Sequence, residues 1–239
     1  MEIDRLNRRY ALFQADPILE LALLPDQGYC NLNYQAVTKH ARYLIRKLKP
    51  NALDRTFEYK TQQKAYARKI AAKPLHFDLL NHVIIAEFAQ GEHRHTLTPR
   101  ELRTLALSLR KLHKIKLRKS PYNLKKEFRP KEVKAHKALR TLQREPRELV
   151  LTHHDLNPRN ILFHQNKITL IDWEYTGVND RYFDLATIAS EFRLSPKEER
   201  YFLQRYFQNH TRINLKKLRA YKELYQILCS LWFENLEQK

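Results

Sequence analysis

The stretches Leu-Thr-His-His-Asp-Leu-Asn-Pro-Arg-Asn-Ile-Leu-Phe at 151–163 and Leu-Ile-Asp-Trp-Glu-Tyr-Thr-Gly at 170–177 decide the fold class of this chain. Between their polar parts lie two short apolar runs, 161–163 and 168–171, separated by turn-forming residues, a pattern typical of a β-hairpin. A hairpin brings its two flanks together. We therefore expect the polar cluster before Ile161 to lie beside the acidic cluster after Ile171.

The two clusters supply the groups that phosphoryl transfer needs. The spacing His153-x-Asp155-x-x-x-x-Asn160, followed after the hairpin by Asp172, matches a kinase catalytic loop and its metal-binding aspartate. It predicts Asp155 as the catalytic base, Asn160 and Asp172 as Mg²⁺ ligands, and His153 as a residue that orients the loop through a hydrogen bond to nearby backbone. Glu174 either binds a second ion through water or holds a cationic substrate.

Simpler interpretations exist for each of these residues. A single Asp or His near a turn more often caps the turn or faces solvent, so the prediction depends on two clusters joined by one hairpin. The adjacent His153 and His154 do not predict a zinc site, because neighbouring residues on a strand point to opposite faces.

Working outward, the second half of the chain has the signals of helices. Thr98 to Glu101 and Ser195 to Glu198 are capping boxes with proline at the first helical position, and 215–236 is apolar at helical spacing. In the first half, 1–24 predicts one or two short helices, 29–37 and 42–48 predict a β-hairpin, and 55–72 predicts a helix that ends before Pro74. The apolar run 82–88 predicts a buried strand followed by a linker.

These elements predict an α+β fold with two lobes, divided near residue 90. Residues 1–90 would form a small N-terminal nucleotide-binding lobe with an antiparallel sheet and a helix. Residues 91–239 would form a larger, mostly helical, catalytic and substrate-binding lobe that carries the short catalytic hairpin.

Composition excludes several classes of protein. With 43% hydrophobic residues in 239, the chain can bury a sizeable core, so disorder and fibrous repeats are excluded. Two cysteines in no CxxC pair indicate a reducing, cytoplasmic setting, and no apolar run is long enough to span a membrane. The net charge of +19 attracts anions such as nucleotides, nucleic acid or acidic lipid, without selecting one.

The two quoted stretches, with Asn179-Asp180 and 183–186, resemble the choline kinase and aminoglycoside phosphotransferase family, which has the protein-kinase-like fold. The likeness is strongest to its bacterial choline/ethanolamine kinase and thiamine kinase branch. It implies ATP and Mg²⁺ as cofactors and transfer of the γ-phosphate to a small cationic alcohol. Choline or ethanolamine is the first expectation and thiamine the second. An aminoglycoside ranks lower, because the C-terminal tail offers only Glu234 and Glu237 as an acidic rim.

The resemblance also implies roles for residues of the first lobe. Arg46, with Lys47 as the alternative, would contact the nucleotide phosphates, and Glu58 would be its ion-pair partner. The backbone of Glu87, Phe88 and Ala89 would bind adenine. The expected nucleotide-covering loop at 27–34 has a single glycine, so its asparagines would supply phosphate contacts: Asn31 and Asn33. The plainer interpretations are an exposed strand cation for Arg46 and a helix-face charge for Glu58.

A cationic alcohol would need aromatic walls and nearby acids. The candidates are Trp173, Tyr175, Tyr225 and Trp232, with Glu174 and Asp184 as charges. Leu224, Leu228 and Leu231 show that the last helix also packs, so Trp232 is either core or part of the cage.

Two other function classes remain open from the sequence. A nucleic-acid-binding protein would use the Lys-rich runs at 110–119 and 125–126, although such runs are more often solvated helix faces. A catalytically dead kinase fold would serve as a scaffold, and the intact Asp155, Asn160 and Asp172 argue against it.

Overall fold

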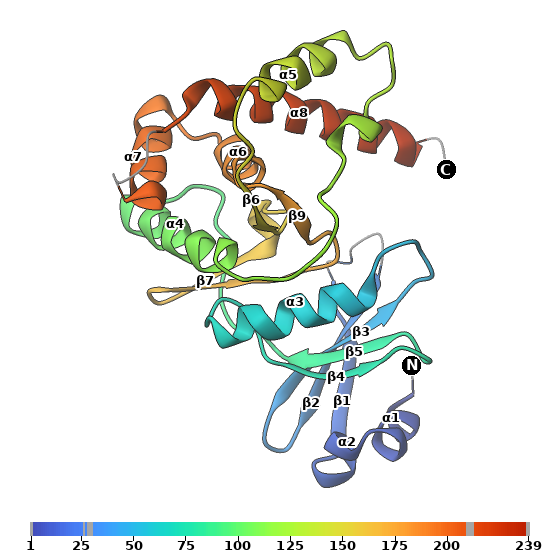
Figure 1. The fold of residues 1–239 in the computed structure, drawn as a ribbon. Coiled ribbons are helices and arrows are strands. Elements are labelled where there is room, and N and C mark those ends of the chain that lie inside the picture. Colours follow the sequence, from blue (N-terminus) through green and yellow to red (C-terminus); the bar gives the residue numbers. More distant parts are fainter. Residues whose placement is uncertain (1, 26, 28–30, 209–212, 238–239) are drawn as a thin grey trace. The chain divides into compact units, whose positions relative to one another are not determined.

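The computed structural model describes residues 2–25, 27, 31–208 and 213–237. It divides the chain into two compact units, Met1–Gln90 and Gly91–Lys239, each of which is drawn in Figure 1. Gly91, at the start of the second unit, has φ +144°, and a Cβ there would lie 3.0 Å from both Leu162 Cβ and Phe163 O. Glycine is therefore required at this point, since the backbone approaches the hairpin too closely for any other residue.

The first unit is built on a five-stranded antiparallel sheet in the order β1-β2-β3-β5-β4. Its strands are β1 (Ile18–Leu23), β2 (Asn31–Thr38), β3 (Arg42–Leu48), β4 (Pro74–Asp78) and β5 (Val83–Glu87), and its helices are α1 (Ile3–Arg9), α2 (Ala11–Ala15) and α3 (Arg55–Ala67). The strands expected at 29–37, 42–48 and 82–88 are confirmed within the described residues as β2, β3 and β5.

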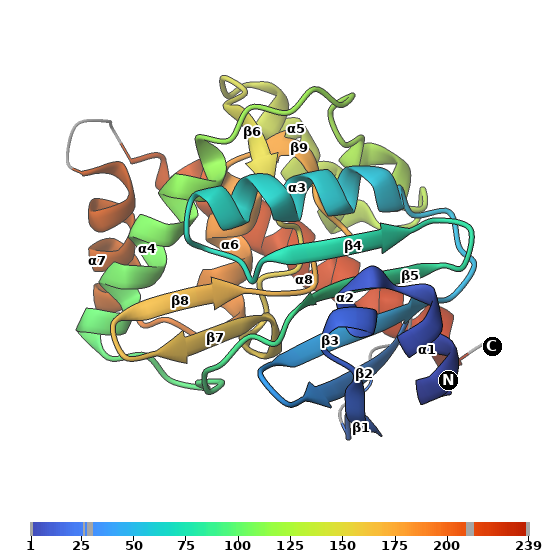
Figure 2. The same cartoon turned by 90° about the horizontal axis from the view of Figure 1, so that it is seen from below.

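The two faces of this sheet are covered by different helices. On one face, Tyr10 and Phe13 of the first two helices join Ala36, Ile45 and Ile85 in a buried apolar core. Because side chains alternate along a strand, Arg46 points to the opposite face from Ile45, and there it meets Glu58 of α3. Figure 2 shows α3 along one side of the sheet and α1 and α2 on the other.

Two expectations for the first unit are wrong, and one strand was not predicted. Residues 18–23 are strand β1 and not helix, because the chain is broken at Pro17 and the side chain of Asn7 bonds the backbone N–H of Ile18 at 2.9 Å. The helix expected over 55–72 ends at Ala67, where Arg68 N–H bonds back to Ala65 O. Strand β4 was not expected, since it is a short edge strand of five residues, none of them fully buried, and therefore has no apolar run.

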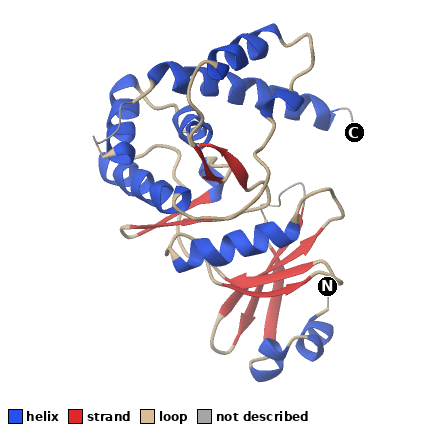
Figure 3. Cartoon of the chain, in the orientation of Figure 1, coloured by secondary structure: helices blue, strands red, loops and turns tan. Residues whose placement is uncertain are grey.

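The second unit is mainly helical (Figure 3). Its helices are α4 (Pro99–His113), α5 (Val133–Gln143), α6 (Tyr182–Glu191), α7 (Pro196–Phe207) and α8 (Leu215–Glu237), with 3₁₀ turns η1 (Leu124–Glu127) and η2 (Pro158–Asn160). Both predicted capping boxes are present, at Thr98 with Glu101 and at Ser195 with Glu198. No helix within the described ranges has the length and apolar character needed to cross a membrane.

Two short antiparallel strand pairs position the polar loops of this unit. The predicted hairpin is confirmed as β7 (Ile161–His164) and β8 (Lys167–Leu170), and a second pair joins β6 (Leu149–Thr152) to β9 (Gly177–Asp180). The β6 strand leads into the polar cluster, and β9 follows the acidic one. The loop at 153–160 and the loop at 171–176 are therefore fixed at both ends and held side by side.

Candidate active site

Asp155 lies in the loop between β6 and η2 and is held by two amides. Its Oδ1 accepts a hydrogen bond from Asn157 Nδ2 at 2.8 Å, and its Oδ2 accepts one from Asn160 Nδ2 at 2.7 Å. Burial raises the pKa of the Asp155 carboxyl to about 6, with Asp172 and Glu174 raising it further and the two amides opposing the shift. The carboxylate is thus rigidly aimed and ready to take a proton near neutral pH.

Asn160 is fixed by the same contact. Its Nδ2 also donates to the main-chain oxygen of Asp155 at 2.9 Å, so the amide nitrogen faces Asp155 and Oδ1 faces away. Its own carbonyl accepts from Ile171 N at 3.0 Å, which closes the base of the hairpin. The hairpin therefore places Asn160 next to the chain that leads to Asp172.

His153, in the first loop, contacts the second loop at Ile171 and Trp173. The ring is fully buried, its Nε2 donates to Ile171 O at 3.0 Å, and it packs against the Trp173 ring with centroids 4.7 Å apart. The next residue along the second loop, Asp172, has φ 62°. A positive φ is a strained backbone conformation for a residue other than glycine. The contacts of His153 with Ile171 and Trp173, the two neighbours of Asp172, help to hold it there.

Asp184 supports the catalytic loop from α6 and is completely buried. Its Oδ2 accepts from His153 N at 2.9 Å and from His113 Nε2 at 3.0 Å, and its Oδ1 accepts from His154 N at 3.0 Å. Burial alone would raise the pKa of Asp184, but these donors and the neighbouring histidines lower it overall. The substrate contact expected for Asp184 is therefore wrong, because a substrate has no access to a buried carboxylate whose oxygens are already hydrogen-bonded. Its role is structural.

His113 is a member of this support that sequence reasoning did not single out for chemistry. It lies at the end of α4, is buried, and its Nδ1 accepts from the Tyr206 hydroxyl of α7 at 2.6 Å. That bond fixes the tautomer, because the remaining ring proton then lies on Nε2 and points to Asp184. Burial lowers the pKa of His113, so the ring stays neutral.

His154, in the first loop, contacts the second loop at Tyr175. It has φ 71°, and its Nδ1 donates to Tyr175 O at 2.9 Å, while Nε2 accepts from Asn179 Nδ2 at 3.0 Å. The Tyr122 ring lies 5.0 Å away. Both ring nitrogens are therefore used within the protein, consistent with the expectation against a zinc ligand.

The residues present fit Mg²⁺ bound with phosphate. Among the described residues there is no group of three or more His, Cys, Asp or Glu side chains that could hold a metal alone. The outward Oδ1 of Asn160 and the carboxylate of Asp172 are hard oxygen donors on adjacent loops, and Mg²⁺ typically takes one or two such ligands and completes its shell with water and phosphate oxygens. The donor set thus suits a nucleotide-borne ion rather than a resident metal.

The predicted aromatic cage is only partly accessible. Trp173 is 1% exposed and packs on His153, so it supports the loop and cannot form a wall. Tyr175 and Trp232 are 36% and 38% exposed. Tyr225 is largely buried in α8, and its hydroxyl donates to Glu191 Oε1 at 2.8 Å.

Glu191 was not predicted. It ends α6, and through Tyr225 it belongs to a group that also contains Cys229, whose pKa is raised mainly by burial, with Glu191 and Asp155 contributing. No local pattern marks Glu191, because the group is assembled from α6 and α8.

In the first unit the structure brings some predicted residues together. Arg46 Nη1 bonds Glu58 Oε1 at 2.5 Å, and Arg55 Nη1 bonds Glu58 Oε2 at 2.8 Å, with all three residues buried. Lys47 is on the other face of β3 and donates to Asn81 O at 2.7 Å. Arg46 is therefore the basic residue paired with the helix glutamate.

The asparagines of the first unit differ from each other. Asn31 Oδ1 accepts from Arg55 Nη2 at 3.0 Å, so it braces Arg55 rather than standing free for a phosphate. Asn33 N–H donates to the Gln27 side chain at 2.7 Å, and its Oδ1 is buried without a partner. The rest of the expected phosphate loop, residues 28–30, lies outside the described residues.

The expected adenine-binding backbone is partly occupied. Glu87 N–H bonds Lys73 O at 2.9 Å, and Phe88 N–H bonds Arg42 O at 3.0 Å. Of the three residues named from the sequence, Ala89 has the N–H that these bonds leave for another acceptor.

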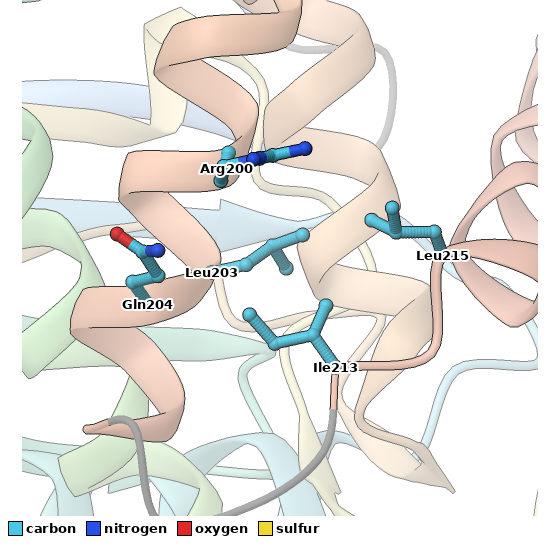
Figure 4. Close-up of a pocket in the computed structure, with 5 residues that line it drawn as sticks. All are labelled: Arg200, Leu203, Gln204, Ile213 and Leu215. Carbon is cyan, nitrogen blue, oxygen red and sulfur yellow. The ribbon is translucent and has the colours of Figure 1, made fainter.

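A separate small pocket of about 230 Å³ contains none of these residues. It is lined by Arg200, Leu203, Gln204, Ile213 and Leu215 (Figure 4). Its lining comes from α7, the start of α8 and the chain before it, and has neither the carboxylates nor the amides described above.

Comparison with known proteins identifies the family. The model of the APH phosphotransferase enzyme family matches residues 22–221, which is most of the chain. The chain belongs to the APH phosphotransferase family.

The chain is also similar to individual known proteins, in sequence or in fold. Protein LicA of Haemophilus influenzae is 33% identical over 93 residues, and the match spans 36% of this chain and only 35% of the relative's length. The crystal structure of choline kinase LicA from Streptococcus pneumoniae has a TM-score of 0.82 at 20% identity, covering 98% of this chain and 90% of that one. A spectinomycin phosphotransferase solved with ADP and spectinomycin has a TM-score of 0.68 at 18% identity, covering 96% and 87%. The predicted kinase-like α+β fold is thereby confirmed.

Proposed function

We propose that this APH-family protein is an ATP- and Mg²⁺-dependent kinase that phosphorylates the hydroxyl of a small cationic alcohol, with choline or ethanolamine as the acceptor. The observation that carries the proposal is Asp155, a carboxylate aimed by Asn157 and Asn160 with its pKa raised to about 6, one hairpin away from Asp172. An aimed base beside hard oxygen ligands is the minimum set for phosphoryl transfer to an alcohol.

Asp155 would accept the proton of the acceptor hydroxyl as the hydroxyl oxygen attacks the γ-phosphorus, and the bond from this phosphorus to the bridging oxygen would break to release ADP. Asn160 and Asp172 would hold Mg²⁺, which neutralises charge on the transferred phosphate when it is bound. His153, His154 and Asp184 keep the two loops in register, because each bonds backbone groups of one or both. The loops are thus organised before substrate binds, which is the principal source of rate in this chemistry.

The first unit would bind the nucleotide. Arg46, held by Glu58, would contact the phosphates, as the corresponding ion pair does in protein kinases. Ala89 would donate its backbone N–H to the adenine, because Glu87 and Phe88 use theirs within the unit. Neither predicted asparagine oxygen would serve this site, because Asn31 Oδ1 accepts from Arg55 and the Oδ1 of Asn33 is a buried acceptor, which an anionic phosphate does not bind.

The acceptor would bind near Glu191, Tyr225 and Glu174 in the second unit. A cationic head group is attracted by carboxylates and by aromatic faces, and Tyr175 and Trp232 are the exposed aromatic residues among those predicted. The similarity to choline kinase LicA favours choline over thiamine and over an aminoglycoside.

The test is coupled ATP turnover by the purified full chain with Mg²⁺, with choline, ethanolamine, thiamine and an aminoglycoside supplied separately. We expect turnover with choline or ethanolamine, its loss in Asp155→Ala, and retention in the control Asp4→Asn, which alters an exposed carboxylate of α1. Turnover that survives Asp155→Ala would overturn the proposed base, and turnover without divalent metal would overturn the proposed roles of Asn160 and Asp172.

A further inference from the structure

Most of the net charge of this protein lies in one segment of the second unit. Residues 110–147, here called the basic segment, contain 15 Lys and Arg and three Asp and Glu, a net charge of +12 out of +19 for the whole chain. The other 201 residues share +7. A general excess of lysine would spread over the chain, so the concentration is a property of this segment.

The basic side chains of this segment face solvent. Fourteen of the 15 are exposed and Arg110 is half-buried. Arg129 forms ion pairs with Glu132 at 3.5 Å and Glu234 at 2.7 Å. Three acidic residues cannot neutralise the remaining cations, so this face keeps a strong positive potential that reaches about one Debye length, roughly 8 Å in physiological salt.

Helix α5 arranges part of this charge on one face. Ala135 and Ala138 are buried, whereas Lys134, Lys137, Arg140 and Arg144 are exposed at intervals of three, three and four residues. This spacing places the four cations on one face of the helix, away from its buried alanines. None of them belongs to the proposed catalytic or nucleotide-binding sites.

Apolar side chains stand exposed beside these cations. Val133, the first residue of α5, is 70% exposed, and Phe233 on α8 is 56% exposed. In the sequence Phe233 precedes Glu234, whose carboxylate pairs with Arg129 of the basic segment, and Val133 lies within that segment. Exposed apolar residues together with many lysines and arginines are typical of proteins that bind at a membrane surface.

Single-stranded nucleic acid needs exposed aromatic rings among the cations, on which successive bases stack, whereas the exposed rings Trp232 and Phe233 lie on α8 and outside the basic segment. Within the basic segment Phe128 is buried, and the half-buried Tyr122 packs on His154. We propose that the basic segment, with Val133 and Phe233, docks the second unit peripherally on a bilayer rich in anionic phospholipids. This inference does not depend on the kinase activity.

The experiment is flotation of the full chain with vesicles of neutral phosphatidylcholine or of phosphatidylcholine with about 30% phosphatidylglycerol, with a DNA duplex as a third ligand. We expect binding to the anionic vesicles only, and release by high salt. Neutralisation of four cations, in Lys134→Gln/Lys137→Gln/Arg140→Gln/Arg144→Gln, should weaken binding about 100-fold or more, because each contributes roughly fivefold near an anionic surface. Val133→Ser/Phe233→Ser should weaken binding to the anionic vesicles at low salt, because it removes the apolar contribution and leaves the charge unchanged.

The matched control removes the same charge elsewhere in the second unit, in Arg193→Gln/Lys197→Gln/Arg200→Gln/Arg205→Gln, and should retain binding. All variants should keep the wild-type circular dichroism spectrum and thermal midpoint, which separates a lost surface from a lost fold. Equal binding to both vesicle types, equal loss in the control, or tight binding of the duplex without vesicle binding would each overturn the proposal.

Discussion

Asp184→Ala tests whether a buried carboxylate organises the catalytic loop. The substitution removes the acceptor of three N–H groups, those of His153, His154 and the His113 ring, all within 3.0 Å. A buried donor left without a partner costs about 1–3 kcal/mol, and loss of one partner of a buried charged network costs about 3–5 kcal/mol. We expect a destabilisation of about 3–5 kcal/mol.

The same change should reduce catalysis, because Asp155 is one residue beyond the backbone N–H groups that Asp184 holds. For a chain of this size 1 kcal/mol corresponds to roughly 2–4 °C in the thermal midpoint, so the midpoint should fall by at least about 6 °C. Asp184→Asn keeps one acceptor oxygen and should lose less of both properties. The assays are thermal unfolding by circular dichroism, and kcat well below the lowered midpoint.

A suitable control is Glu198→Gln, which alters an exposed capping-box carboxylate of α7 without contact to the catalytic loop. It should shift the midpoint slightly and leave kcat unchanged. If Asp184→Ala unfolded within 2 °C of the wild type and kept its kcat within about twofold, the proposed support of the loop would be wrong.

Three further predictions concern single groups. The value of kcat/KM should fall as pH drops through about 6, because protonation of Asp155 removes the base, and a flat profile from pH 5 to 7 would contradict this. Glu58→Gln removes the carboxylate that pairs with two buried guanidiniums, so thermal unfolding should show a loss of about 3–5 kcal/mol and the KM for ATP should rise, whereas an unchanged midpoint would refute the pairing. The free energy of unfolding of His154→Gly should be about 1 kcal/mol higher than that of His154→Ala, because φ is 71° at this position and both variants lack the ring. Equal thermal midpoints of the two variants would exclude backbone strain at residue 154.

The sequence predicts well those parts of the fold that local chemistry determines. Capping boxes such as that at Thr98 satisfy N–H groups within one turn of helix, and the hairpin is encoded by two apolar runs and a turn. Strand β1 was predicted as helix, because its pairing with β2 is determined by residues more than ten positions away. β4 was missed for a different reason, because this short edge strand has no fully buried residue and no apolar run.

The residues of the candidate site also fall into those that the sequence predicts and those that it does not. Asp155, Asn160 and Asp172 carry a spacing that can be found in the sequence, and the hairpin brings the backbone of Asn160 to that of Ile171, the residue before Asp172. His113 and Glu191 have no such spacing, because they reach the site from α4 and α6 through packing with Tyr206 and Tyr225. Asp184 was found in the sequence and given the wrong role, since burial is invisible to a motif.

Asp155, in the loop, and Asp184, on α6, are carboxylates whose pKa values shift in opposite directions. Burial disfavours the charged form of both. Asp184 accepts from two backbone N–H groups and a histidine, and its pKa is lowered, so it remains a fixed anion. Asp155 accepts from two side-chain amides and lies near Asp172 and Glu174, and its pKa is raised to about 6. The number and charge of the neighbouring groups thus set the two pKa values apart, which suits Asp184 to hold the loop and would suit Asp155 to the proposed exchange of a proton.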